Sequence, residues 1–282
     1  MAIVNWNTSG SAADAATAYL ASTGVRASVT IVDNGSGADQ RDELRRRAPA
    51  AARIVWAGRN QGYGRAANSV LDHAGADLVC ASNADVRPAP DMLDQLARVV
   101  LADDRVGVGA PCFDDGLRPY HARLPRAMTL PIRTVLGGWG HRPVDYPEPG
   151  RVAEVEQPGG ACLLARASTW RALGGFDPGF FLWFEDVDLA RRSLAGGRRN
   201  VVVGDARAAH RGGDAFVQMD RRLRHAIRLR SIKRYVAKHH PRLLPLTRVL
   251  AGVGQVVWVR SPRLVRAARR LAEEAGDLRQ PG

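Results

Sequence analysis

Cysteine, aromatic residues and long apolar runs are all scarce in this sequence. Cys80, Cys112 and Cys162 are an odd number without a CxxC pair, so we predict buried free thiols in a reducing compartment rather than a disulfide framework. The longest mainly apolar run, residues 243–259, contains a proline, an arginine and two glycines and is too interrupted to predict a membrane span. No basic region precedes the first apolar residues, which predicts a cytoplasmic protein without a signal peptide.

Acidic residues are scarce in the C-terminal part of the chain. Residues 216–282 hold 16 Lys and Arg but only 4 Asp and Glu, whereas residues 1–215 hold 25 Lys and Arg and 24 Asp and Glu. Residues 216–282 therefore carry nearly all of the formal net charge of +13. We predict a globular domain over residues 1–215 and a basic helical extension over residues 216–282. An anionic membrane surface is the first candidate partner of this extension. A solvated basic face is the second interpretation. Nucleic acid is the third, because no binding motif and few aromatic residues accompany the charge.

Apolar runs alternate with helical segments through most of the chain. This alternation predicts an α/β fold, in which helices cover both faces of a parallel sheet. The first, second and fourth strands end in Asn or Asp, and the carboxyl ends of parallel strands meet at one edge of a sheet, so we expect polar groups to converge there on a ligand. The expected strands are residues 2–7, 27–32, 53–56, 77–82, 106–110, 152–157, 161–165 and 199–203, and the expected helices are residues 11–22, 39–48, 65–74, 90–101 and 168–173.

Residues 180–192 join an aromatic and apolar run to three acids, Glu185, Asp186 and Asp188, at the start of a helix. Acids in a first helical turn interact favourably with the helix dipole, and this is a sufficient structural explanation. A carboxylate at the mouth of an aromatic-lined cleft is also where a general base meets a sugar hydroxyl. The aromatic run favours the catalytic interpretation.

Several other segments suit a ligand, although each also fits a structural role. Residues 60–65 open a helix whose glycine NH groups can approach a phosphate. Residues 83–85, Asn-Ala-Asp, offer one carboxylate to Mg²⁺ or Mn²⁺, and His210 offers an imidazole. Residues 33–36 read as a turn, and residues 159–160, Gly-Gly, fit either a bulge or a close approach of ligand to backbone.

Taken together, the order and spacing of these segments resemble the family 2 glycosyltransferases, inverting enzymes of the GT-A fold, and above all their bacterial rhamnosyltransferase-type branch. The resemblance covers about residues 2–240. It implies a Rossmann-like, nucleotide-sugar-binding α/β fold with a mostly parallel central sheet, followed by the basic helical extension. The matching segments are residues 4–7, 32–36, 60–68, 82–86, 159–166, 174–177 and 180–192, together with a histidine after the last core strand.

The resemblance also implies a role for each matching residue. Asp186 is the general base that takes the proton from the acceptor hydroxyl. Asp85, with His210, holds a divalent metal on the diphosphate. The remaining donor-binding residues are Asn5, Asp33, Asn34, Asn60, Arg65 and Asn83, and the residues bordering the acceptor and the transferred sugar are Gly160, Trp183 and Glu185.

The implied activity is transfer of a sugar, with inversion, from a nucleoside-diphosphate sugar to an acceptor hydroxyl, by a cytoplasmic enzyme peripheral to the inner face of the membrane. The branch resembled suggests dTDP-L-rhamnose and a lipid-linked cell-surface glycan, although no residue distinguishes rhamnose from galactofuranose, glucose or N-acetylglucosamine. A tailoring glycosyltransferase of small natural products is one alternative. A non-catalytic nucleotide-sugar- or glycan-binding protein is another, because residues 83–85 lack the second acid or Asn-Pro-Asp form common in the family. We expect no nucleic-acid partner, and the sequence does not indicate an oligomeric state.

Overall fold

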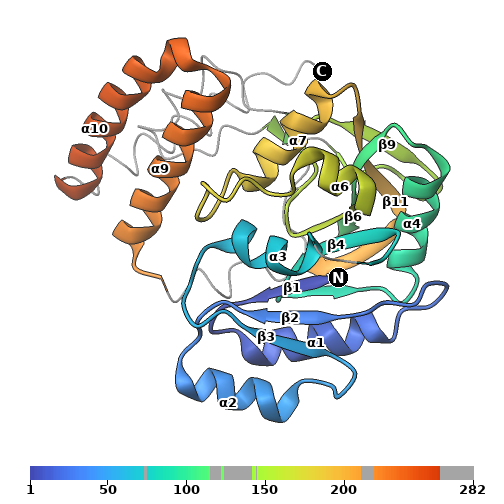
Figure 1. Cartoon of the computed structure of the whole chain (residues 1–282). Coiled ribbons are helices and arrows are strands. Elements are labelled where there is room, and N and C mark those ends of the chain that lie inside the picture. The colour runs from blue at the N-terminus through green and yellow to red at the C-terminus, as the bar shows by residue number, and fades with distance from the viewer. Residues whose placement is uncertain (73–74, 115–121, 124–141, 144, 211–218, 261–282) are drawn as a thin grey trace. The chain divides into compact units, whose positions relative to one another are not determined.

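The structure, a computed structural model, describes residues 1–72, 75–114, 122–123, 142–143, 145–210 and 219–260. The chain forms two compact units, Met1–Leu124 with Pro143–Gln218 and Pro125–Arg142 with Met219–Gly282 (Figure 1). Much of the stretch between the expected strands at residues 106–110 and 152–157 lies outside the described residues. The domain boundary predicted after residue 215 also lies outside them and stays a prediction.

The first unit is built on a nine-stranded sheet of order β3-β2-β1-β4-β10-β6-β11-β5, with β9 paired to β11. Neighbours are parallel in β1–β2, β2–β3, β1–β4 and β6–β11, and antiparallel where β10 meets β4 and β6 and where β11 meets β5 and β9. The mostly parallel sheet expected from the sequence is therefore confirmed. Its strands are β1 (Ala2–Asn5), β2 (Thr30–Asp33), β3 (Arg53–Trp56), β4 (Leu78–Asn83), β5 (Val86–Pro88), β6 (Val106–Phe113), β9 (Val152–Val155), β10 (Cys162–Arg166) and β11 (Arg199–His210); β7 (Ala122–Arg123) and β8 (Arg142–Pro143) are two-residue strands outside it.

Helices cover both faces of this sheet, as the alternation of the sequence predicts (Figure 1). Strand β1 shows how the two faces are built. Ile3 packs in the apolar cluster of the α1, α2 and α4 face, whereas Ala2 and Val4 pack in the cluster of the α3, α6 and α7 face. The helices are α1 (Ser9–Leu20), α2 (Ala38–Arg47), α3 (Tyr63–Leu71), α4 (Met92–Ala102), α6 (Ala167–Leu173) and α7 (Glu185–Ala195).

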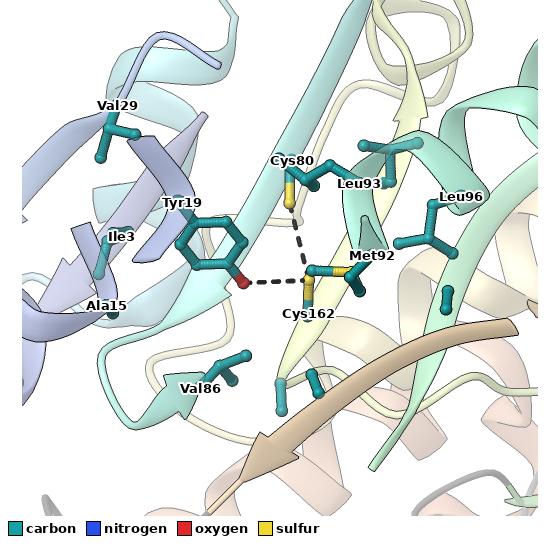
Figure 2. Packing of buried hydrophobic residues seen from close by; sticks show 14 of the residues in the cluster. Ile3, Ala15, Tyr19, Val29, Cys80, Val86, Met92, Leu93, Leu96 and Cys162 are labelled. Atoms are coloured by element: carbon teal, nitrogen blue, oxygen red, sulfur yellow. Dashed lines mark hydrogen bonds between the residues drawn. The ribbon is translucent and has the colours of Figure 1, made fainter. Parts of the chain in front are cut away.

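The three cysteines are buried free thiols, as predicted. Figure 2 shows Cys80 on β4 and Cys162 on β10, whose Sγ atoms are 3.7 Å apart. The Tyr19 hydroxyl lies 3.5 Å from the Cys162 Sγ and 2.8 Å from the Ser82 Oγ. Helix α1 is thereby joined to two central strands, and β4 carries Asn83 at its carboxyl end.

One strand is longer than the sequence suggests. The apolar run predicts a strand over residues 199–203, but β11 continues to His210 after an irregularity that follows Val203. The extension pairs with β5, where His210 is opposite Val86. Strand β5 has three residues and ends in a proline, so no apolar run reveals this pairing in the sequence.

The second unit contains α9 (Arg221–His239), η1 (Pro241–Leu243) and α10 (Leu244–Arg260), in line with the helical character expected of the C-terminal part. The Asp220 side chain caps α9 by accepting hydrogen bonds from the backbone NH groups of Arg222 and Leu223, at 2.9 and 3.1 Å. In the described part of the chain, every helix is too short or too polar to cross a bilayer.

Candidate functional site

The carboxyl ends of β1, β2 and β4 form one polar edge, as expected. Asn5 is opposite Asp33 in the sheet, and Val4 is opposite Asn83. The Asn5 Nδ2 donates to the Asp33 Oδ2 at 3.0 Å, and the backbone NH of Ser36 donates to the Asp33 Oδ1 at 3.1 Å. Asn5 and Asp33 are almost completely buried, so their side chains fix the end of the sheet against which a ligand would lie.

Asn34 joins this edge to the glycine-containing loop before α3. Its Nδ2 donates to the Asn60 Oδ1 at 3.1 Å, and its Oδ1 accepts the backbone NH of Gln61 at 3.0 Å. The Asn60 Oδ1 also accepts the backbone NH of Gly62 at 3.0 Å. The structure therefore brings the predicted donor residues Asn34 and Asn60 together, in contact with each other.

The same glycine loop is bonded to the segment before α7. The backbone NH of Tyr63 donates to the Phe181 carbonyl at 3.0 Å. Gly62 has a φ of +90°, and a Cβ there would overlap that carbonyl, so the join requires glycine. The Nε of Arg65, an exposed predicted donor residue, donates to the Pro178 carbonyl at 3.0 Å.

Asn68 on α3 makes a further connection to the segment before α7. Its Nδ2 donates to the Phe176 carbonyl at 2.8 Å, and its Oδ1 accepts the Phe176 NH at 3.1 Å. Helix α3 is therefore bonded to the backbone at Phe176, ahead of the segment that carries the three acids.

Helix α7 begins after two residues in an unusual backbone conformation. Trp183 and Phe184 have φ values of +65° and +70°, which are rare for residues other than glycine. Such conformations cost about 1–3 kcal/mol each and are concentrated at functional sites. Phe184 is buried and Trp183 is partly exposed, and the two residues turn the chain so that Glu185 and Asp186 begin the helix.

Asp186 is held by hydrogen bonds on both carboxylate oxygens. Its Oδ1 accepts the backbone NH of Val187 at 2.9 Å, and its Oδ2 lies 3.5 Å from the Gln157 Nε2. The backbone NH of Gly160 also donates to this carboxylate. A Cβ on Gly160 would lie 2.7 Å from the Asp186 Oδ2, so Gly160, predicted to border the acceptor, gives the carboxylate its space.

Glu185 and Asp186 differ in their affinity for protons. Burial and the neighbouring Asp186 charge raise the pKa of Glu185 to about 8, and its Oε2 has no hydrogen-bond partner among the described residues. Burial also raises the pKa of Asp186, but the Val187 and Gly160 NH groups and the Gln157 amide favour its ionised form. Of the two acids, the hydrogen bonds to Asp186 therefore favour its ionised form, whereas Glu185, with a pKa of about 8, favours the protonated form.

Asp85 and His210 also come together, although 125 positions separate them in the sequence. The Asp85 Oδ1 is 3.2 Å from the His210 Nε2, and both side chains are nearly buried, since the antiparallel pairing of β5 and β11 brings them to one place. One carboxylate and one imidazole at this separation fit adjacent positions around a six-coordinate divalent ion, whose neighbouring ligands lie roughly 3 Å apart. The described residues hold no cluster of three His, Cys, Asp or Glu.

Two contact residues were missed from the sequence. Phe181 contributes a backbone carbonyl, which no side-chain pattern can reveal. Gln157 contacts Asp186 from the segment between β9 and β10, and its closeness to the Gly-Gly pair at residues 159–160 was the available signal.

Comparison with known proteins gives this geometry a context. The model of the family "Glycosyl transferase family 2" matches residues 3–150. Two curated sequences from Mycobacterium tuberculosis, strains CDC 1551 / Oshkosh and ATCC 25618 / H37Rv, are each named N-acetylglucosaminyl-diphospho-decaprenol L-rhamnosyltransferase and are 30% identical over 204 residues. Each match covers 65% of this chain and 66% of the relative, just under two thirds of its length.

Solved structures extend the similarity to the fold. The mannosyltransferase PcManGT from Pyrobaculum calidifontis, in complex with GDP-Man and Mn²⁺, has a TM-score of 0.54 at 16% identity, covering 100% of this chain and 75% of that one. GalNAc-T7, crystallised with UDP, GalNAc and Mn²⁺, has a TM-score of 0.52 at 14% identity, covering 74% of this chain and 43% of that one. At these identities the likeness establishes the fold.

Proposed function

Since the chain belongs to glycosyl transferase family 2 and has the GT-A fold, we propose that it transfers a sugar, with inversion, from a nucleoside-diphosphate sugar to an acceptor hydroxyl. The observation that carries this proposal is the environment of the Asp186 carboxylate. A carboxylate at the start of α7, held by Gln157 and Gly160 beside a protonated Glu185, has the properties of a general base.

In this proposal Asp186 accepts the proton of the acceptor hydroxyl as that oxygen attacks the anomeric carbon. The nucleoside diphosphate leaves from the opposite face of the sugar, so the configuration inverts and the transition state has oxocarbenium character. The polar edge that contains Asn5 and Asp33 positions the nucleoside, and the glycine loop lies against the diphosphate. A protonated Glu185 adds no second negative charge beside the developing cation.

Asp85 and His210 are the residues that would hold a divalent ion, Mg²⁺ or Mn²⁺. When bound, this ion neutralises negative charge on the diphosphate. Their nearly buried oxygen and nitrogen donors, 3.2 Å apart, support the assignment, and PcManGT and GalNAc-T7 each carry Mn²⁺ in their crystals. The chain itself has to bring these two donors together and to leave the remaining positions to the substrate.

The proposed donor is dTDP-L-rhamnose and the proposed acceptor is a polyprenol-diphosphate-linked N-acetylglucosamine. The support is the activity for which the mycobacterial relatives are named, together with the resemblance of the motifs. A lipid-linked acceptor places the reaction at a membrane surface, so we also propose peripheral attachment through the second unit.

The exposed face of α9 supports this attachment. Four cations, Arg222, Arg230, Arg234 and Lys238, are exposed at spacings of four or eight residues and so follow one side of the helix. The sequence from residue 221 to residue 260 contains no acid. Cations on one face are attracted to anionic lipid head groups by about 1 kcal/mol each near the surface.

Sedimentation with phosphatidylglycerol vesicles tests the attachment. Arg222→Gln, Arg230→Gln and Arg234→Gln together should release the protein from these vesicles. The same change at the exposed Arg26, Arg46 and Arg105 of the first unit should not release it. Equal release by both sets, or equal binding to uncharged phosphatidylcholine vesicles, contradicts the proposed surface.

Thermal unfolding with nucleotide sugars tests the donor site. Ligands that bind only the folded state raise Tm. At a ligand concentration of a hundred times Kd, the free energy of unfolding increases by about 2.7 kcal/mol. We expect dTDP-L-rhamnose to raise Tm with Mn²⁺ and to raise it less without. Asp85→Asn should remove the metal-dependent part. If Asp85→Asn shows the same Tm shift as the wild type, the metal assignment is rejected. If no dTDP, UDP or GDP sugar shifts the Tm of the wild type, the donor site is rejected.

A further inference from the structure

Gln157 contacts the proposed base but has one end unused. The residue lies in the segment between β9 and β10 and is 3% exposed. Its Nε2 faces the Asp186 Oδ2 at 3.5 Å. Its Oε1 is buried and has no hydrogen-bond partner among the described residues.

The orientation of this amide follows from the chemistry of Asp186. An ionised carboxylate can only accept hydrogen bonds, so the amide must turn its NH₂ group toward Asp186 and its carbonyl oxygen away. A buried carbonyl oxygen without a donor is costly, and buried acceptors in proteins nearly always have a donor. The Gln157 Oε1 therefore suits a donor that arrives with the substrate.

The position of Gln157 narrows the choice of this donor. Its two amide ends belong to one rigid, planar group, so whatever binds the Oε1 lies next to the Asp186 carboxylate. The acceptor hydroxyl that reacts gives its proton to Asp186. A hydroxyl on the neighbouring carbon of the same sugar is therefore the candidate donor to the Gln157 Oε1.

We propose, on the basis of the glycosyl transfer proposed above, that Gln157 binds the acceptor sugar through its Oε1 and positions Asp186 through its Nε2. The hydroxyl that it recognises is vicinal to the one that reacts. Gln157 thus selects which hydroxyl of the acceptor faces the base, and it sets the linkage position.

Gly160 strengthens this assignment because, lacking a side chain, it leaves room for the Asp186 carboxylate beside Gln157. A Cβ at residue 160 would lie 2.7–2.9 Å from the Asp186 Oδ2, Cβ and Cγ atoms. The Gly160 backbone NH donates to the same carboxylate. One short segment, residues 157–160, therefore fixes the base and presents the unused amide oxygen.

The test compares two Gln157 variants in transfer from dTDP-L-rhamnose to N-acetylglucosaminyl-diphospho-polyprenol. Gln157→Met removes both amide interactions at similar volume, so KM for the acceptor should rise about tenfold while KM for the donor stays unchanged. Gln157→Glu keeps an acceptor oxygen but places a second carboxylate beside Asp186. It should shift the acidic limb of the pH profile of kcat/KM to higher pH.

Gln95→Met is the matched control, since Gln95 donates from the surface of α4 to Asp91. Acceptor analogues that lack one hydroxyl sharpen the test. Removing the vicinal hydroxyl should cost the wild type about tenfold in kcat/KM and should cost Gln157→Met nothing more.

The outcomes separate this inference from the proposed function. Transfer by Gln157→Met with wild-type acceptor KM, together with an unshifted pH profile in Gln157→Glu, overturns the role of Gln157 and leaves the glycosyl transfer intact. Absence of transfer by the wild type overturns both. If Gln157→Met does not fold, the pH profile of Gln157→Glu and the deoxy acceptor series on the wild type still decide the question.

Discussion

The proposed site has a donor side and a base side, and these two sides are built in contrasting ways. On the donor side, Asn5, Asp33, Asn34 and Asn60 bond to one another and to nearby backbone groups. On the base side, the described structure leaves buried polar atoms of Tyr63, Gln157 and Glu185 without hydrogen-bond partners. These four side chains are therefore bonded within the protein, whereas buried polar atoms of the three base-side residues are not bonded to any described residue.

The backbone repeats this contrast. Around the donor edge, positive φ angles fall on Gly35 and Gly62, which tolerate them, and on Asn7, a residue type that adopts them more readily than most. Before α7 they fall on Trp183 and Phe184, which do not adopt them readily. Strain and unused polar atoms are therefore concentrated around the residues that are proposed to do chemistry, which is where sequence and stability conflict most often.

The largest expected effect comes from removing the base. Asp186→Asn keeps the volume and the helix start but cannot take a proton, so we expect transfer to fall by about 10²–10⁴-fold. Donor binding, followed by Tm, should remain. Asp91→Asn on the surface of α4 is the control. If the transfer rate of Asp186→Asn falls by tenfold or less, Asp186 is not the general base, and the base side does not have the role proposed for it.

Breaking the join between the two sides comes next. Gly62→Ala introduces a Cβ against the Phe181 carbonyl at a φ of +90°, so we expect a loss of about 1–3 kcal/mol in the free energy of unfolding, together with weaker transfer. Gly37→Ala is the control, because Gly37 has a φ of −62° and a Cβ there would make only an ordinary contact with the Asn7 Oδ1, at 3.9 Å. Equal denaturation midpoints for the two variants would show that the contact between Gly62 and Phe181 does not contribute to the free energy of unfolding.

A smaller effect is expected at the donor edge. Asn34→Ala removes a hydrogen bond to Asn60 and another from Gln61, so it should cost about 1–3 kcal/mol in stability and reduce the donor-induced rise in Tm. KM for the acceptor should not change. A change in acceptor KM without any change in donor affinity would break the division between the two sides.

The smallest effect on activity at neutral pH is expected at Glu185. The pKa of this group rises from 4.5 to about 8 in the folded protein, so between these values the folded state holds a proton that the unfolded state has lost. Stability should therefore be greatest below the unfolded value and should fall as pH rises toward 8. Glu185→Gln, an uncharged substitute, should flatten this slope and retain most of the transfer activity at pH 7.

Urea unfolding of the wild type and of Glu185→Gln between pH 5 and pH 9 measures how stability changes with pH. The pH profiles of transfer by the two proteins measure the effect on activity. The variant should remain active above pH 8, where the wild type gains a second charge beside Asp186. An unchanged stability slope would mean that Glu185 is ionised in the folded protein, against the contrast drawn between the two acids.

The sequence predicts the donor side better than the base side. Strands that end in Asn5, Asp33 and Asn83 can be recognised from apolar runs, and parallel pairing then brings their ends together. The start of α7 at Glu185 and the C-cap glycines of α6, Gly174 and Gly175, follow from local rules in the same way.

Long-range pairing that leaves no local pattern cannot be predicted from the sequence. Strand β10 runs antiparallel within an otherwise parallel region, and the three-residue β5 sets the position of His210. The contact of Arg65 with a backbone carbonyl and that of Gln157 with Asp186 depend on the packing of loops. No periodicity records such contacts.

The stereochemistry of the product tests the central claim most directly. Purified protein is incubated with Mn²⁺, dTDP-L-rhamnose and N-acetylglucosaminyl-diphospho-polyprenol, and the anomeric configuration of the new linkage is read by NMR, with Asp186→Asn in parallel. The account predicts an inverted linkage from the wild type and almost no product from the variant. A retained configuration, or equal product from Asp186→Asn, would contradict it.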